Sequence, residues 1–177
     1  NCEECAAATR HDAYGISSFV YAKRRPFDHQ RLNNVIKGLK LRDMPDHVHD
    51  ATSPLRMVIR SKGFLWLNSK HHNCFYWSHA GASFKIRVAG SWWNALPADQ
   101  WPDDDFPKEL QEDFDDEYGD CRQEIVFIGV KMDEAAIRKK LDGALLNDEE
   151  FEAFRQRYKA GDWRKIIQEK YGVKVQN

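Results

Sequence analysis

The sequence lacks any long hydrophobic run and any excess of basic residues. No apolar stretch among its 177 residues approaches the roughly 20 residues that a membrane-spanning helix needs. Lys and Arg number 27 against 28 Asp and Glu, so the formal net charge is −1. A general nucleic-acid-binding protein needs a basic surplus to neutralise phosphates. We therefore expect neither a membrane nor a nucleic acid as partner.

Cysteine is also scarce, with four residues at positions 2, 5, 74 and 121. That spacing differs from the dense, even pattern of small secreted domains that disulfides hold together. Residues 1–10 show no basic-then-apolar leader pattern, and we expect them to be a linker or tail. The expected compartment is the cytoplasm or another reducing one, the interior of an organelle included.

Common catalytic and nucleotide-binding motifs are missing as well. There is no Gly-x-x-x-x-Gly-Lys-Ser/Thr phosphate loop, no Gly-x-Gly-x-x-Gly, no Gly-x-Ser-x-Gly and no His-Glu-x-x-His. An enzyme of the classes that carry these motifs is therefore not expected within this chain. The sequence leaves an unusual enzyme open.

The composition is that of one globular domain, with 42% hydrophobic and 31% charged residues. The charge is unevenly distributed, because residues 99–120 hold eleven acidic side chains and one basic one. Prolines at 97, 102 and 107 fall in or beside this segment and favour an exposed acidic insertion at 99–117. Such an insertion could be merely solvated, could dock a basic partner, or could bind hard cations weakly through its oxygens.

Hydrophobic periodicity predicts an α+β fold, with an antiparallel or mixed sheet of about five strands and helices packed on one face. The strand 123–130 is apolar enough to be central, and Asp28 and Asp133 are expected to cap helices. Gly63 suggests a bulge or bend that divides one strand. The predicted strands are 14–23, 55–67 with a break at 61–63, 74–79, 83–89 and 123–130, and the predicted helices are 29–40, 107–118, 133–142, 148–159 and 162–171.

Thiols and imidazoles are the clearest candidate metal ligands, because both suit a borderline-soft ion such as zinc. A closed structural zinc site needs four ligands, and no second Cys-x-x-Cys is present. The competing interpretations are a frayed terminus for the first pair and solvated polar loops for the histidines. Cys74 and Cys121 are expected to be small buried hydrophobic residues instead. The candidate metal ligands are Cys2, Cys5, His47, His49, His71 and His72.

Basic and aromatic side chains supply candidate interaction residues. Arg60, Lys62 and Arg122 could bind a phosphate or a partner's carboxylate, or could form structural ion pairs and a solvated edge. Among six tryptophans, those at 66 and 77 are expected in the core. The remaining candidates, Trp92, Trp93 and Trp101, are expected to pack at the surface or in an interface.

The sequence contains five ordered blocks, 14–27 (YGISSFVYAKRRPF), 60–67 (RSKGFLWL), Trp77 with Gly81, 119–129 (GDCRQEIVFIG) and 141–150 (LDGALLNDEE). Together they resemble the C-terminal domain of the CobW family. The opening block is closest to the subgroup of nitrile hydratase activators and zinc-responsive metallochaperones. Cys121 departs from the family, which usually has Arg there.

The resemblance implies a second domain without a catalytic centre of its own. Family members are GTPases that deliver metal, most often zinc, to client proteins, and others serve cobalamin synthesis or nitrile hydratase maturation. Their phosphate loop and Cys-x-Cys-Cys motif lie in an N-terminal GTPase domain, and nothing here matches either. GTP and magnesium would bind only in that domain. The implied division is a linker at 1–10 and a CobW C-terminal-like domain at 11–177.

Three hypotheses follow. The first is a regulatory and client-binding domain of a GTP-dependent metallochaperone, with the GTPase domain of the same protein and a metalloprotein client as partners. The second is a stand-alone module that binds metal through His47, His49, His71 and His72. The third is an interaction module that joins a larger assembly through the acidic insertion and surface tryptophans.

Overall fold

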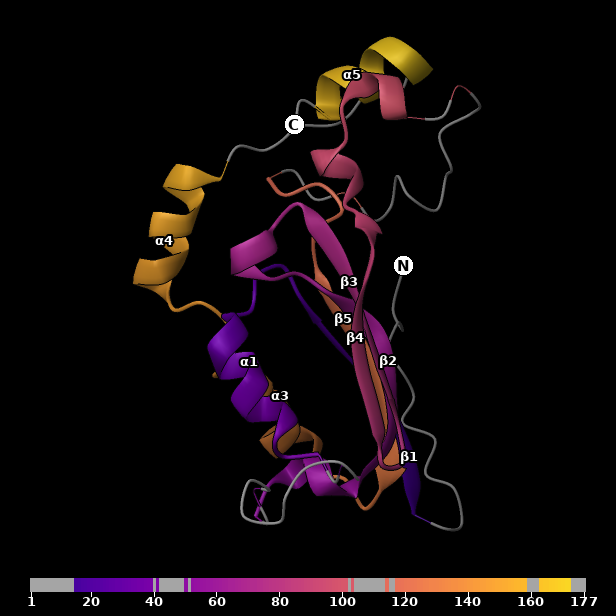
Figure 1. Cartoon of the computed structure of the whole chain (residues 1–177), viewed down its shortest axis with the longest axis vertical. Helices are drawn as coiled ribbons and strands as arrows, with labels where there is room; N and C mark the ends of the chain where they lie inside the picture. The colour runs from indigo at the N-terminus through magenta and orange to yellow at the C-terminus, as the bar shows by residue number, and fades with distance from the viewer. Residues whose placement is uncertain are drawn as a thin grey trace, which may run out of the picture.

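The computed structural model describes residues 15–39, 41, 50, 52–101, 103, 114, 117–158 and 163–172, with the backbone alone at 163 and 164. These residues form a sheet with helices on one side (Figure 1). The candidate ligands Cys2, Cys5, His47 and His49 lie outside the described residues, as does most of the predicted helix 107–118. The elements are β1 (Ile16–Lys23), α1 (His29–Ile36), β2 (Val58–Leu65), β3 (Asn73–Ala80), β4 (Ser83–Ser91), β5 (Gln123–Val130), α3 (Glu134–Asp142), α4 (Asp148–Arg157) and α5 (Trp163–Tyr171).

The sheet has five strands in the order β1-β5-β2-β3-β4, and every neighbouring pair is antiparallel. The predicted fold class is therefore confirmed. β5 lies between β1 and β2, as its apolar sequence predicts, and alternates buried with partly exposed residues. β3 and β4 form the predicted hairpin around Gly81. β1 and β5 pair although about a hundred residues separate them in the chain.

The predicted break at Gly63 is wrong. β2 runs unbroken through this residue, and its register with β5 shifts between Val58 and Arg60 instead. Gly63 allows the backbones of β2 and β5 to lie close together, because a Cβ atom there would lie 1.9 Å from the carbonyl oxygen of Glu124 on the neighbouring strand. The 3-10 helix Pro54–Met57 replaces the first part of the predicted strand.

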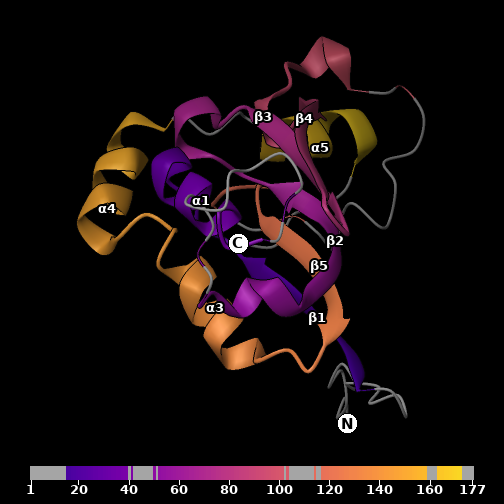
Figure 2. The ribbon, with the colours of Figure 1, turned by 60° about the horizontal axis from the view of Figure 1, so that its bottom comes forward.

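α1 and α3 cover one face of the sheet, called here the inner face, and Figures 1 and 2 show both helices on the same side. Asp28 caps α1 by accepting the N–H groups of Gln30 and Arg31, and Asp133 caps α3, as predicted. α1 ends at Ile36, earlier than expected, because 3-10-type bonds close its last turn. The inner-face core contains Phe19, Tyr21, Leu32, Val35, Leu65, Phe75, Trp77, Ile125, Phe127, Ile137 and Leu141.

Two smaller clusters lie at one end of the sheet, near α4 and α5 (Figure 1). α4 contributes Phe154 to the first, which surrounds the buried Trp66. α5 contributes Ile167 to the second, where it meets the buried Trp101. Among the described residues, no helix is long and apolar enough to cross a membrane.

Candidate functional site

His71 and His72 lie side by side in the turn before β3, with ring centroids 3.9 Å apart. The ring of His71 also meets the rings of Phe154 and Tyr158 edge-on, at 5.7 and 5.3 Å. Burial and the neighbouring His72 lower the pKa of His71, so its imidazole is neutral at physiological pH. A neutral imidazole is the form that binds a metal ion.

The start of α4 determines where Phe154 and Tyr158 lie. Asn147 forms a capping box with Glu150, because the side chain of each residue accepts the backbone N–H of the other. Glu150 also accepts hydrogen bonds from the guanidinium of Arg31 on α1. The carboxylate of Glu150 therefore caps the N-terminus of α4 and also links α4 to α1.

A hollow of about 530 Å³ is lined by residues of α4 and of the turn that carries His71. Aromatic, basic and acidic groups all line it, so its chemistry favours no single ligand class. The lining residues that bear on the site are Asp28, Asn68, His71, Glu150, Phe154 and Tyr158.

The two described cysteines are unsuited to metal binding at neutral pH. Both are buried and free, as predicted. Burial raises the pKa of the Cys74 thiol to about 12, and burial also raises the pKa of Cys121. Because the thiolate is the metal ligand, these shifts disfavour metal binding by either sulfur. Among the described residues, no group of three or more His, Cys, Asp or Glu could hold a metal ion, so these residues do not fit a closed, resident zinc site.

Asp120 is a buried carboxylate that the sequence patterns did not single out. Its buried carboxylate accepts the backbone N–H groups of Trp93 and Asn94 at 2.9 and 3.0 Å. Burial raises the pKa of Asp120, while these bonds and Arg122 oppose the rise. Gly119 beside it has φ +60°, and a Cβ atom there would lie 2.7 Å from Asn94. This pairing holds the 3-10 helix Trp93–Ala95 against the start of β5.

The tryptophans are only partly where the sequence predicts them. Trp66 and Trp77 are fully buried, as expected. The expected surface position is wrong for Trp92 and Trp101, which are 3% and 2% exposed, because each packs within a cluster of this chain. Trp93 is half-buried against Trp101. A role in binding partners stays a prediction for all three candidates.

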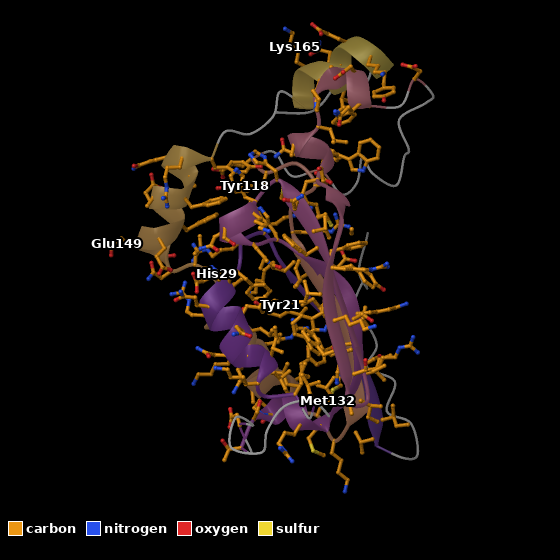
Figure 3. The ribbon with its side chains drawn as sticks, in the orientation of Figure 1. Tyr21, His29, Tyr118, Met132, Glu149 and Lys165 are labelled. Carbon is orange, nitrogen blue, oxygen red and sulfur yellow. The ribbon has the colours of Figure 1, made fainter. Side chains whose placement is uncertain are left out.

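The basic candidates Arg60 and Lys62 project from the face of the sheet that lies opposite α1 and α3, called here the outer face. Both are exposed. Arg122 lies just before β5, and its guanidinium forms an ion pair with Glu124 at 2.6 Å. The structural ion pair that the sequence left open therefore exists for Arg122. Figure 3 shows side chains that end in nitrogen on the outer side of the sheet.

The model of the CobW C-terminal domain, described as that of the cobalamin synthesis protein cobW, matches residues 16–145. This range starts with β1, ends after α3 and includes the complete sheet. The chain belongs to the family of CobW C-terminal domains. The family resemblance expected from the sequence is therefore confirmed.

Two of the curated relatives carry zinc in their names. The zinc-regulated GTPase metalloprotein activator 1 of Dictyostelium discoideum is 36% identical over 138 residues, which cover 77% of this chain and 26% of the relative. A zinc chaperone of Mycobacterium tuberculosis is 28% identical over 155 residues, which cover 84% of this chain and 35% of the relative. The CobW-type chain thus spans about a quarter to a third of these relatives.

Among solved structures, the Zn(II)-bound YjiA GTPase from E. coli is similar, with a TM-score of 0.47 and 19% sequence identity. The match covers 73% of this CobW-type chain and 30% of the other chain.

Proposed function

We propose that this CobW-type domain is the regulatory and client-binding part of a GTP-dependent zinc chaperone, and that it has no catalytic activity of its own. The 36% identity to a zinc-regulated GTPase metalloprotein activator carries this proposal. In it, GTP and magnesium bind to a separate GTPase domain, and the described residues of this chain contact that domain and the metalloprotein client.

The architecture suits a binding role. Of the described helices, α1 and α3 cover the inner face and α4 and α5 lie at one end of the sheet, so the described residues leave the outer face and the hollow beside His71 open to contacts. A domain that contacts both the GTPase domain and the client can couple nucleotide state to client binding, provided that the contacts differ between the two states.

Exchange of domains tests this function. A chimera would carry this chain in place of the 138 matching residues of the Dictyostelium activator and would be expressed in cells that lack the activator. We expect the chimera to restore growth when a chelator limits zinc. The activator without those residues should not restore it.

The readout separates the proposed role from a general requirement for a folded domain. A chimera that is expressed at the normal level and hydrolyses GTP, yet gives no growth benefit in limited zinc, would contradict the proposal. Equal rescue by the activator without its C-terminal residues would contradict it as well.

Zinc in this proposal is cargo, and His71 and His72 are the described side chains best placed to contact it. Two ligands bind zinc less tightly than the four of a closed structural site. Calorimetric zinc titration of the chain and of the His71→Ala/His72→Ala variant tests this contact, and the variant should bind more weakly. His29→Ala is a matched control, since His29 is exposed at the start of α1. Equal affinity in all three proteins would argue against a zinc contact at the pair.

A further inference from the structure

The outer face divides into an apolar half and a basic half. In the register of the sheet, Val20 of β1 pairs with Val126 of β5, and Lys62 of β2 pairs with the same residue on its other side. Cross-strand partners share a face. The apolar half therefore lies on β1 and β5, with Val20, Val126 and Ile128, and the basic half lies on β2, β3 and β4, with Arg60, Lys62, Lys85 and Arg87.

The positive charges of the basic half are not neutralised by the described residues. Arg60 and Lys62 are two residues apart on one strand, about 7 Å from each other. Neither they nor Lys85 has an ion-pair partner among the described residues. Arg87 stacks over the ring of Tyr76 at 5.2 Å, which leaves its charge uncompensated. Like charges this close repel one another.

The apolar half is partly open to solvent, because Val126 and Ile128 are partly exposed and Val20 is exposed. Val20 is 41% exposed and Phe64, at the border of the two halves, is 37% exposed. Phe64 packs edge-on against Tyr76. Figures 1 and 2 show no described helix over the outer face of the sheet. Burying them would release hydrophobic free energy in proportion to the area removed from water.

We propose that the outer face binds a protein partner whose contact surface places carboxylates beside apolar side chains. The carboxylates complement the four cations of the basic half, and the apolar side chains cover Val20 and Phe64. This deepens the proposed function by giving the chemistry of a partner surface. It can fail while the zinc-chaperone function stands, since the exchange of domains does not depend on which face is used.

The observations favour a protein over a nucleic acid as the partner. A nucleic-acid surface requires cations spread along a backbone path, with exposed aromatic rings for stacking. On the outer face the cations occupy one half only, and the other half is aliphatic.

A peptide with a block of glutamates followed by a block of leucines is the probe for this surface. Backbone amide NMR of the complete chain would locate the contact, and fluorescence anisotropy would give its affinity. We expect saturable binding with a Kd below about 1 mM, and shifts confined to β1, β5, β2, β3 and β4. Peptides with glutamine for glutamate or serine for leucine should each bind about tenfold more weakly or worse.

Two double variants with the same change in net charge distinguish binding at the outer face from general electrostatic attraction of the acidic peptide. Arg60→Glu/Lys62→Glu should weaken binding of the probe about tenfold or more. Lys70→Glu/Lys139→Glu, at exposed positions away from the outer face, should leave it within about twofold. Equal weakening by both variants would overturn the proposal. Tighter binding of single-stranded oligothymidine at the same residues, or self-association abolished by Arg60→Glu/Lys62→Glu, would overturn it in favour of a nucleic acid or a second copy.

Discussion

Two buried tryptophans show how one polar atom distinguishes residues of the same type. Trp66 and Trp77 are both fully buried. The indole nitrogen of Trp77 donates a hydrogen bond to the hydroxyl of Ser61 at 2.8 Å, whereas that of Trp66 has no hydrogen-bond partner among the described residues. An unpaired buried donor costs about 1–3 kcal/mol. Packing of the two side chains therefore contributes similarly to the free energy of unfolding, whereas the hydrogen bonding of their indole nitrogens contributes differently.

Replacement of each tryptophan by Phe tests this difference. Both changes remove the same atoms, so the free-energy cost of the cavity left behind is similar. Trp77→Phe also leaves the Ser61 hydroxyl unpaired, while Trp66→Phe removes a donor that was already unpaired. We expect Trp77→Phe to lower the free energy of unfolding by about 1–2 kcal/mol more than Trp66→Phe, measured by urea unfolding followed by circular dichroism. Equal losses would contradict this account, and Ser61→Ala should cost less in the Trp77→Phe background than alone.

At the scale of the elements, the start of α4 links two parts of the molecule that are distant in sequence. Its capping box and the bond from Glu150 to Arg31 join α4 to α1. The same helix places Phe154 and Tyr158 against His71. The cap of α4 therefore determines the geometry of the candidate site.

Asn147→Ala removes this cap and should destabilise the chain by about 1 kcal/mol. Amide hydrogen exchange should accelerate in α4 while the strands keep their protection. Glu149→Ala is the control, because Glu149 is in the same turn and projects into solvent (Figure 3). It should change stability by less than about 0.5 kcal/mol. Equal effects of the two changes would show that the capping box does not hold α4.

For the whole molecule, the near-zero net charge conceals a separation of charges. The inner side uses its charges in pairs, such as Arg31 with Glu150 and Lys140 with Asp50. Among the described residues, the outer-face cations Arg60, Lys62 and Lys85 form no such pair. We expect these cations to serve binding rather than stability.

Arg60→Ser/Lys62→Ser tests whether the outer cations serve stability. We expect the free energy of unfolding to stay within about 0.5 kcal/mol of the original, with a slight gain at low salt as repulsion disappears. Arg31→Ser, which removes the solvent-exposed ion pair with Glu150, should cost about 0.5–1 kcal/mol. Thermal unfolding at two salt concentrations would measure both. A large loss in the double variant would assign these cations to folding.

Local patterns were sufficient where neighbours in the chain decide the structure. Alternating apolar residues in β5 and the caps Asp28 and Asp133 predicted strand and helices correctly, because pleat and cap geometry are local. Gly63 and Trp101 were misinterpreted. The reason lies in their partners, the carbonyl of Glu124 and the rings around Trp101, which are distant in sequence. The same limit applies to the candidate site, where Phe154 lies 83 positions from its neighbour His71.

The sequence by itself determined the fold class, the order of the elements and the family, because periodicity and ordered motifs are properties of the chain as written. Tertiary structure alone decided that β1 pairs with β5, that α4 lies against His71, and that Arg60 and Lys62 share an outer face with exposed apolar side chains. Those relations come from packing between segments that are distant in the chain, and no local propensity encodes which distant segments meet.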